Sequence, residues 1–151
     1  MNFLRLRFPE NGVEARARLF QDLAPATCAA VWKHLPLQGR SLHDIWSGRQ
    51  IFLPLRASLA VEPENASLYV VPGDLYYYER PARLDRGRPY GYLELSEIGI
   101  VYGRDSQPWS PRGPKVVNIF ASMEENLEAF ARACEQMVWD GSQDLEILPG
   151  S

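Results

Sequence analysis

Proline is concentrated in the middle of the sequence, where it limits the length of any strand. Eight of the twelve prolines lie between Leu42 and Phe120. Because proline has no N–H to donate to a neighbouring strand, it marks turns, edges and bulges. Short strands separated by turn residues predict a mainly β fold, either a barrel or a sandwich. The apolar runs between the prolines are Arg49–Leu53, Ser67–Val71, Asp74–Glu79, Ser96–Tyr102 and Lys115–Phe120.

The two ends of the sequence show a second strand signal, which is alternation of apolar and polar residues. Asn2–Phe8 and Val13–Phe20 both alternate, and Asn11-Gly12 lies between them. Alternation is typical of half-buried strands, and Asn-Gly is a strong hairpin turn. Gln143–Leu148 alternates in the same way. We therefore expect an N-terminal hairpin and a closing C-terminal strand.

The first of two predicted helices covers Pro25–Leu35. Cys28, Val31, Trp32 and Leu35 follow the i, i+3, i+4, i+7 spacing of an amphipathic helix. Proline suits the first turn, and Pro36 would end the helix.

The second predicted helix covers Met123–Asp140, with Gly141 as its left-handed terminator. Ser122 and Glu125 have the spacing of a capping box at its start. One apolar stripe runs along it, formed by Met123, Leu127, Phe130, Cys134, Met137 and Val138.

Length and charge restrict the class of protein. A chain of 151 residues fits one domain, residues 1–151, and its net charge of −3 argues against binding to nucleic acid. No stretch has the apolar length of a signal peptide or a membrane span. We expect a cytoplasmic protein that binds neither nucleic acid nor membrane.

Metal and cofactor motifs are missing from the sequence. Cys28 and Cys134 fall on the apolar stripes of the two helices, which predicts reduced core thiols. With His34 and His43 as the only histidines, no zinc site has the usual ligand spacing. The glycines lack the spacing of a dinucleotide-binding or phosphate-binding loop. We expect no metal and no cofactor.

Arginine and tyrosine are unevenly used. The chain has fourteen arginines and two lysines, and all seven tyrosines lie between Tyr69 and Tyr102. Glu79–Tyr92 holds four arginines without apolar periodicity, which predicts a long surface loop. Such a loop is either simply solvated or contributes to oligomer contacts or to the cover of a pocket. A homo-oligomer is expected on this basis.

The order of elements and several short motifs resemble known proteins. Ala17–Thr27 (ARLFQDLAPAT) resembles the second strand of cyclophilins and the Ala-Pro-x-Thr entry to their first helix. The whole chain is more similar to a family of small, uncharacterised cyclophilin-like proteins of bacteria and archaea. The motifs that carry this likeness are Trp46-Ser47-Gly48, Pro72-Gly73-Asp74, Tyr76-Tyr77-Tyr78, Glu97–Gly103 (EIGIVYG), Asn118–Ala121 (NIFA) and Trp139–Gln143 (WDGSQ).

The resemblance implies a closed eight-stranded cyclophilin-like β-barrel capped by two α-helices, about Pro25–Leu35 and Met123–Asp140. It implies no established activity, and fold alone does not give function. In cyclophilins, prolyl isomerisation uses an Arg, an apolar proline pocket and a Gln carried in Phe-His-Arg-Val and Gln-Gly-Gly segments. Leu42–Gln50 does not match the first segment, and the second is missing. An isomerase-like protein with a degenerate site, in which Arg49 is recruited, is one alternative.

A pocket for a small molecule is the function favoured by the sequence. Polar and aromatic residues interrupt otherwise apolar strands, and pockets combine apolar walls with a few fixed polar groups. Glu97 and His43 are the candidates for acid–base chemistry, Glu97 if it is buried and His43 because histidine is the side chain suited to such chemistry near neutral pH. A pocket around Trp46, Tyr76, Glu97 and Asn118 would bind a small polar or anionic molecule. The expected ligand-binding residues are Trp46, Arg49, Tyr76, Tyr78, Tyr102, Asn118 and Phe120.

Structural roles compete with each of these assignments. Glu97 is expected at a strand end on the surface if it has no function, and Trp46 and Phe120 would serve in packing. A protein-interaction module built on tyrosines and the arginine-rich loop is a further alternative, compatible with a pocket.

Overall fold

The computed structural model describes residues 2–79, 96–111 and 113–151. The expected loop Glu79–Tyr92 therefore lies outside the described residues, apart from Glu79. The helices are α1 (Pro25–Lys33) and α2 (Leu127–Asp140). The strands are β1 (Phe3–Arg7), β2 (Glu14–Leu19), β3 (Leu37–His43), β4 (Gln50–Leu55), β5 (Ala66–Ser67), β6 (Asp74–Tyr78), β7 (Ser96–Val101), β8 (Trp109–Ser110), β9 (Gly113–Pro114), β10 (Val117–Glu125) and β11 (Gln143–Pro149).

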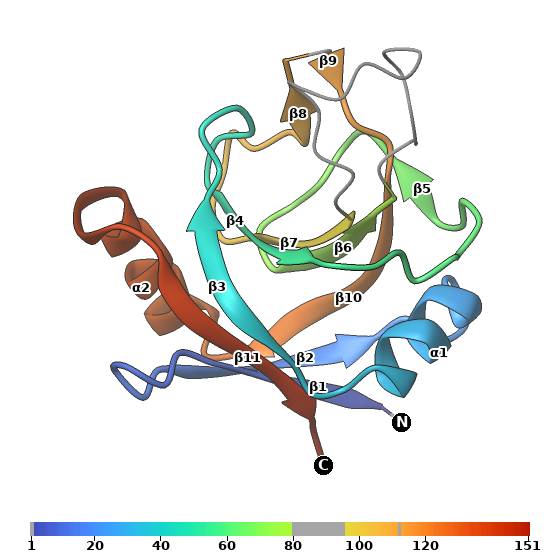
Figure 1. Cartoon of the computed structure of the whole chain (residues 1–151), viewed down its shortest axis with the longest axis horizontal. Helices are drawn as coiled ribbons and strands as arrows, with labels where there is room; N and C mark the ends of the chain where they lie inside the picture. The colour runs from blue at the N-terminus through green and yellow to red at the C-terminus, as the bar shows by residue number, and fades with distance from the viewer. Residues whose placement is uncertain (1, 80–95, 112) are drawn as a thin grey trace.

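Eight antiparallel strands form a closed barrel. Their order is β2-β1-β11-β3-β4-β7-β6-β10, and β10 pairs back with β2 to close it. β5 adds to β10, while β8 and β9 form a separate hairpin. Figure 1 shows α2 on one side of the barrel, next to β3, and α1 on the other. The expected eight-stranded barrel with two helices is confirmed.

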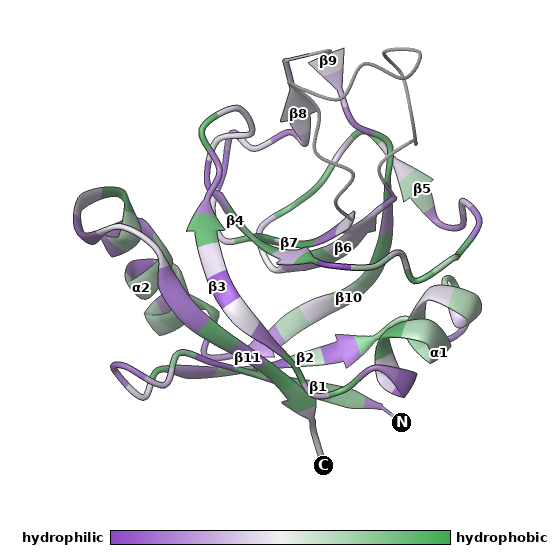
Figure 2. Cartoon of the chain, viewed as in Figure 1, coloured by the Kyte–Doolittle hydropathy of each residue, from purple (hydrophilic) through white to green (hydrophobic). Residues whose placement is uncertain are grey.

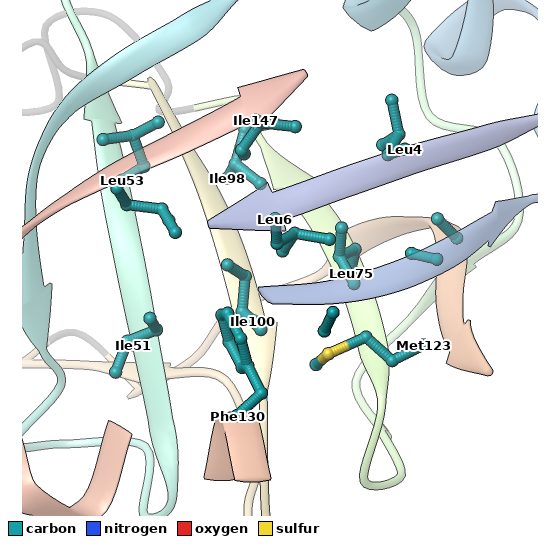
Figure 3. Packing of buried hydrophobic residues seen from close by; sticks show 14 of the residues in the cluster. Leu4, Leu6, Ile51, Leu53, Leu75, Ile98, Ile100, Met123, Phe130 and Ile147 are labelled. Carbon is teal, nitrogen blue, oxygen red and sulfur yellow. The ribbon is translucent and has the colours of Figure 1, made fainter. Parts of the chain in front are cut away.

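The barrel interior is filled by alternate residues of the strands and by both helices. Figure 3 shows Leu6, Leu75, Ile98 and Ile100 close together between the strands. Figure 2 shows the alternation behind this arrangement, as hydrophilic and hydrophobic residues follow one another along β2. The set of apolar positions predicted from alternation is therefore the set that lines the core.

The helices complete this core from outside the strands. The ring of Phe130 in α2 stacks on Phe8 with 4.7 Å between centroids. Both cysteines are free and fully buried, Cys28 in α1 and Cys134 in α2. The predicted reduced core thiols are confirmed.

The start of the second helix was wrongly predicted. Ser122 and Glu125 lie in β10 and form no capping box, because the strand continues to Glu125 along β2. Met123 pairs with Ala17 and points into the core there, so its apolar side chain fits the strand. The helix starts instead after Asn126, whose φ of 63° breaks the strand. Gly141, at φ 90°, ends the helix as expected.

Two strands differ from the sequence prediction for a common reason. β3 was not predicted, because its inward positions include Gly39 and Ser41 rather than an apolar series. Its neighbour β4 fills that space, since the Cδ1 atom of Leu53 reaches Gly39. Ser67–Val71 was predicted as a strand, but only Ala66–Ser67 pairs with β10. Small or irregular segments depend on their neighbours and carry little pattern of their own.

The sheet formed by β4, β7 and β6 is buried on both faces. A second, smaller apolar cluster covers its outer face, centred on Tyr76, Val101 and Val117. Every residue of β7 is buried as a result, which explains its continuous apolar run. The outer face of these three strands is where polar side chains gather.

Candidate functional site on the outer face of the barrel

Tyr76 anchors the outer face. Tyr76 and Tyr78 point outward while Tyr77 points into the barrel core, as the alternation predicts. The Tyr76 hydroxyl donates to Oε1 of Gln50 at 2.7 Å, and Nε2 of Gln50 donates to the Ser47 carbonyl at 3.1 Å. Burial, with the nearby Glu97 and Asp44 charges, raises the pKa of Tyr76 well above its usual value. Tyr76 is thus a permanent donor that ties β6 to the segment before β4.

That segment, residues 44–49, is held by side-chain hydrogen bonds. The buried carboxylate of Asp44 accepts the backbone N–H groups of Trp46 at 2.7 Å and Ser47 at 3.0 Å. Gly48 has φ +83°, and a Cβ atom there would lie 2.5 Å from the Asp105 carbonyl oxygen. Only glycine fits both conditions. The Trp-Ser-Gly motif therefore encodes one fixed turn.

Ser47 connects this turn to the β8–β9 hairpin. Its Oγ accepts the N–H of Trp109 at 2.9 Å and faces the Trp109 carbonyl oxygen at 3.3 Å. The hairpin then returns the chain to Lys115, whose N–H donates to the Pro108 carbonyl at 2.9 Å. Trp46, Trp109 and Lys115 are thus brought to one rim by a single small network.

A pocket of about 330 Å³ lies between these segments. Its volume is in the range of small-molecule sites, about 300–1,000 Å³. Trp46 stays 56% exposed at its edge although its backbone is fixed. The walls of the pocket are formed by Leu42, His43, Asp44, Ile45, Trp46, Phe52, Trp109, Ser110, Pro111 and Lys115.

A buried ion pair stands at the wall of this pocket. Nζ of Lys115 donates to Oε1 of Glu97, and the two side chains are only 6% and 7% exposed. The ammonium also lies 4.8 Å from the ring centroid of Tyr78. Glu97 is therefore buried rather than a surface carboxylate. It lies behind Lys115, which is the member of the pair that lines the pocket.

His43 has both ring nitrogens engaged. Nδ1 lies 2.8 Å from the Asp44 carbonyl oxygen, which can only accept, so Nδ1 carries the proton. Nε2 then accepts from the Tyr102 hydroxyl at 2.6 Å. Burial raises the pKa of Tyr102 to about 12, which keeps this donor protonated. His43 also borders a second pocket of about 290 Å³ against α2.

Of the seven expected ligand-binding residues, only Trp46 lines this pocket. Tyr76, Tyr78 and Tyr102 lie behind it and contact Gln50, Lys115 and His43.

The other three expected ligand-binding residues lie elsewhere. Asn118 faces the opposite side of the sheet. It forms hydrogen bonds with Thr27 in α1 and with the backbone of Glu62 and Glu64, so it connects α1 to the segment between β4 and β5. The single pocket expected around Trp46, Tyr76, Glu97 and Asn118 is wrong, because only Trp46 of these four lines the pocket. Phe120 is a fully buried core residue, and Arg49 is exposed against Gly103, outside the pocket walls.

Sequence reasoning missed Lys115, Asp44, Ser47 and Trp109. Lys115 had a usable signal, because it is one of only two lysines in an arginine-rich chain. The other three join the site through contacts between distant segments, which no local pattern indicates.

Other classes of site have little support in the described residues. They contain no group of three or more His, Cys, Asp or Glu side chains that could hold a metal ion. Within the same residues, no helix combines the length and the apolar character that a membrane crossing requires.

Comparison with known proteins places the chain in a family. The family model described as "Protein of unknown function (DUF3830)" matches residues 6–148. No functionally curated protein matches the chain. The uncharacterised family expected from the motifs is confirmed at this level.

Two solved structures share the fold. The structure of McbB in complex with tryptophan superposes with a TM-score of 0.71 at 15% identity, over 98% of this chain and 45% of McbB. The chain thus spans less than half of McbB. The solution structure of the hypothetical protein AF2241 from Archaeoglobus fulgidus has a TM-score of 0.59 at 19% identity, over 99% of this chain and 95% of that protein.

Proposed function

The chain belongs to the DUF3830 family of proteins of unknown function, and we propose that it binds a small molecule in the outer-face pocket. The ligand has a planar apolar body and a carbonyl or carboxylate oxygen at one end. The observation that carries this proposal is that Lys115, buried in an ion pair with Glu97, lines a pocket together with Trp46 and Trp109.

The tryptophans provide the apolar walls. Trp46 is held through its backbone by Asp44, and Trp109 through its backbone by Ser47. Aromatic side chains offer a large contact area at a low cost in conformational entropy. Because the backbone of both residues is held by the protein itself, the positions of the two walls are set without a ligand.

Lys115 provides the polar contact. An ammonium has three N–H donors, and Glu97 accepts one of them. A ligand oxygen can take another, so an anionic or polar end is directed toward the wall that Lys115 occupies. Glu97 acts through Lys115 as a positioning residue, and His43 contributes to the wall near Ile45.

The isomerase alternative has less support. Arg49, which it requires, is exposed and outside the pocket walls. The homo-oligomer and the cytoplasmic location remain predictions.

A titration with three matched probes tests the proposal. Indole-3-acetate carries an aromatic body and a carboxylate, indole carries only the body, and acetate only the carboxylate. Indole-3-acetate is expected to bind most tightly in isothermal titration calorimetry. L-tryptophan joins the set because McbB was solved with it. No saturable binding by any probe would refute the proposal.

Two tryptophan variants locate the binding. Trp46→Ala removes one wall of the pocket. It is expected to weaken the binding of indole-3-acetate by about tenfold, the equivalent of one aromatic contact. Trp139→Ala is the matched control, because Trp139 is 81% exposed on α2 and does not line the pocket. Equal loss in both variants would place the binding elsewhere.

A further inference from the structure

Lysine is rare in this chain, and its two positions are very different. Lys33 is exposed on α1, whereas Lys115 is almost fully buried. All fourteen other basic residues that carry a fixed charge are arginines. Arginine cannot lose its proton in a protein, whereas lysine can, and a neutral amine is a nucleophile. The buried position thus holds the one type of cation that can do covalent chemistry.

The surroundings of Lys115 suit such chemistry. Its Nζ contacts the Glu97 carboxylate and lies 4.8 Å from the centroid of the Tyr78 ring, and Lys115 is one of the residues that line the outer-face pocket. A carboxylate in direct contact with an ammonium can accept its proton. Glu97 is therefore a proton acceptor already in contact with the amine.

We propose that Lys115 forms a Schiff base with a small aldehyde or ketone that has a planar apolar body. This inference rests on the proposed function, because the carbonyl compound must first enter the pocket. The aromatic walls of Trp46 and Trp109 hold the body, and the carbonyl carbon meets Nζ.

The reaction balances without any further reagent. Glu97 takes one proton from the ammonium, and the free electron pair of Nζ forms a bond to the carbonyl carbon. The carbonyl oxygen receives that proton from Glu97 and leaves as water after a second proton moves from nitrogen to oxygen. The sum is one ammonium plus one carbonyl compound giving one protonated imine plus water. The imine keeps the positive charge, so it stays paired with the Glu97 carboxylate.

Reductive trapping tests this inference on the intact protein. Phenylpyruvate, a 2-oxo acid with an aromatic ring, is added with sodium cyanoborohydride, and the adduct is mapped by peptide mass spectrometry. The adduct is expected on Lys115 and not on Lys33, although Lys33 is the more exposed lysine. Adducts on Lys33 or on the amino terminus, with Lys115 unmodified, would overturn the inference.

Variants and a competitor separate the roles. Lys33→Arg is expected to leave trapping unchanged, and Lys115→Arg to abolish it while keeping a cation beside Glu97. Glu97→Gln keeps the size of the side chain but not the proton acceptor, and trapping is expected to slow by about 100-fold. Since Glu97→Gln can unfold the protein, a competition in the wild type provides a second measurement. There, indole-3-acetate, which has no ketone, is expected to protect Lys115.

The two proposals fail in distinguishable ways. If indole-3-acetate and phenylpyruvate bind in calorimetry but no adduct forms on Lys115, the pocket stands and the Schiff base is refuted. If neither probe binds and nothing is trapped, both are refuted.

Discussion

The ring of Tyr76 lies directly on the backbone of Gly99, its partner across the β6–β7 ladder. A Cβ atom at position 99 would come within 2.0 Å of Cζ of Tyr76 and 2.4 Å of two further ring carbons. The glycine of the Glu-Ile-Gly-Ile segment thus makes room for the tyrosine that anchors the segment before β4. Two motifs that are separate in the sequence are one contact in the structure.

Gly99→Ala is therefore expected to destabilise the protein by about 1–3 kcal/mol, the usual cost of overpacking. The buried ring cannot move without losing its bond to Gln50. A lower denaturant midpoint measures the effect. Gly39→Ala is the control, because its new Cβ would meet Leu53 Cδ1 at 3.4 Å, an ordinary contact. Comparable losses in both variants would contradict the tight contact at Gly99.

The Lys115–Glu97 pair gives a prediction for stability apart from function. Glu97→Leu or Lys115→Met leaves the other charge buried without its partner and is expected to cost about 3–5 kcal/mol. The double variant removes both charges and is expected to regain most of that loss. Chemical denaturation of the four proteins gives the coupling energy. Additive losses would mean that the pair does not interact.

An exposed pair serves as the control for this cycle. Arg132 and Glu128 pair on the surface of α2, with side chains 67% and 91% exposed. The free energy of unfolding of Arg132→Ala is expected to stay within about 0.5 kcal/mol of the wild-type value.

The raised pKa of Tyr102 predicts a loss of stability in alkaline solution. Its pKa in the folded protein is about 12, above the ordinary value of 10.0, so the unfolded chain releases its proton first. The contribution of Tyr102 to the free energy of unfolding is therefore fully present below pH 10. It falls by roughly 2 kcal/mol as the pH rises toward 12. Denaturation at pH 8 and at pH 11.5 measures the fall. Tyr102→Phe should show a smaller fall, and an identical one would exclude Tyr102 as a source.

The two cysteines are expected to resist thiol reagents until the protein unfolds. Both are fully buried, and burial raises the pKa of Cys28 to about 11 and that of Cys134 well above its ordinary value. This rise of about two units in the pKa of Cys28 lowers the fraction of its reactive thiolate form by about 100-fold at pH 8. Ellman's reagent is expected to find two thiols in denaturant and almost none in the native protein. Rapid native labelling of either thiol would contradict the buried positions.

The sequence was a good guide wherever one residue pattern has one structural solution. Alternation around Asn11-Gly12 predicted the first hairpin, and the spacing from Cys28 to Leu35 predicted α1 to within two residues of its end. Met123 was ambiguous, because an apolar residue there fits both a helical stripe and an inward strand position. Pairing with Ala17 on β2 decided for the strand, and only tertiary structure contains that pairing.

The site was only half predictable for a similar reason. Tyr76, Tyr78 and Glu97 share one face, because strand geometry fixes alternate residues on the same side. The prediction for Asn118 was wrong, because its position opposite Tyr77 in the β6–β10 ladder turns its side chain to the other face. The pocket itself depends on Ser47 meeting Trp109, a contact between segments far apart in the chain.

Closure of the barrel also determines when the protein can fold. The hairpin of β1 and β2 forms from the first residues, yet its two neighbouring strands are β11 and β10. The outer edges of this hairpin therefore stay unpaired until β10 and β11, which are distant in the sequence, are in place. Contacts of such sequence separation slow folding, because the chain must close a long loop before they form. The local β1–β2 pairing is thus completed into a barrel only by long-range pairing with β10 and β11.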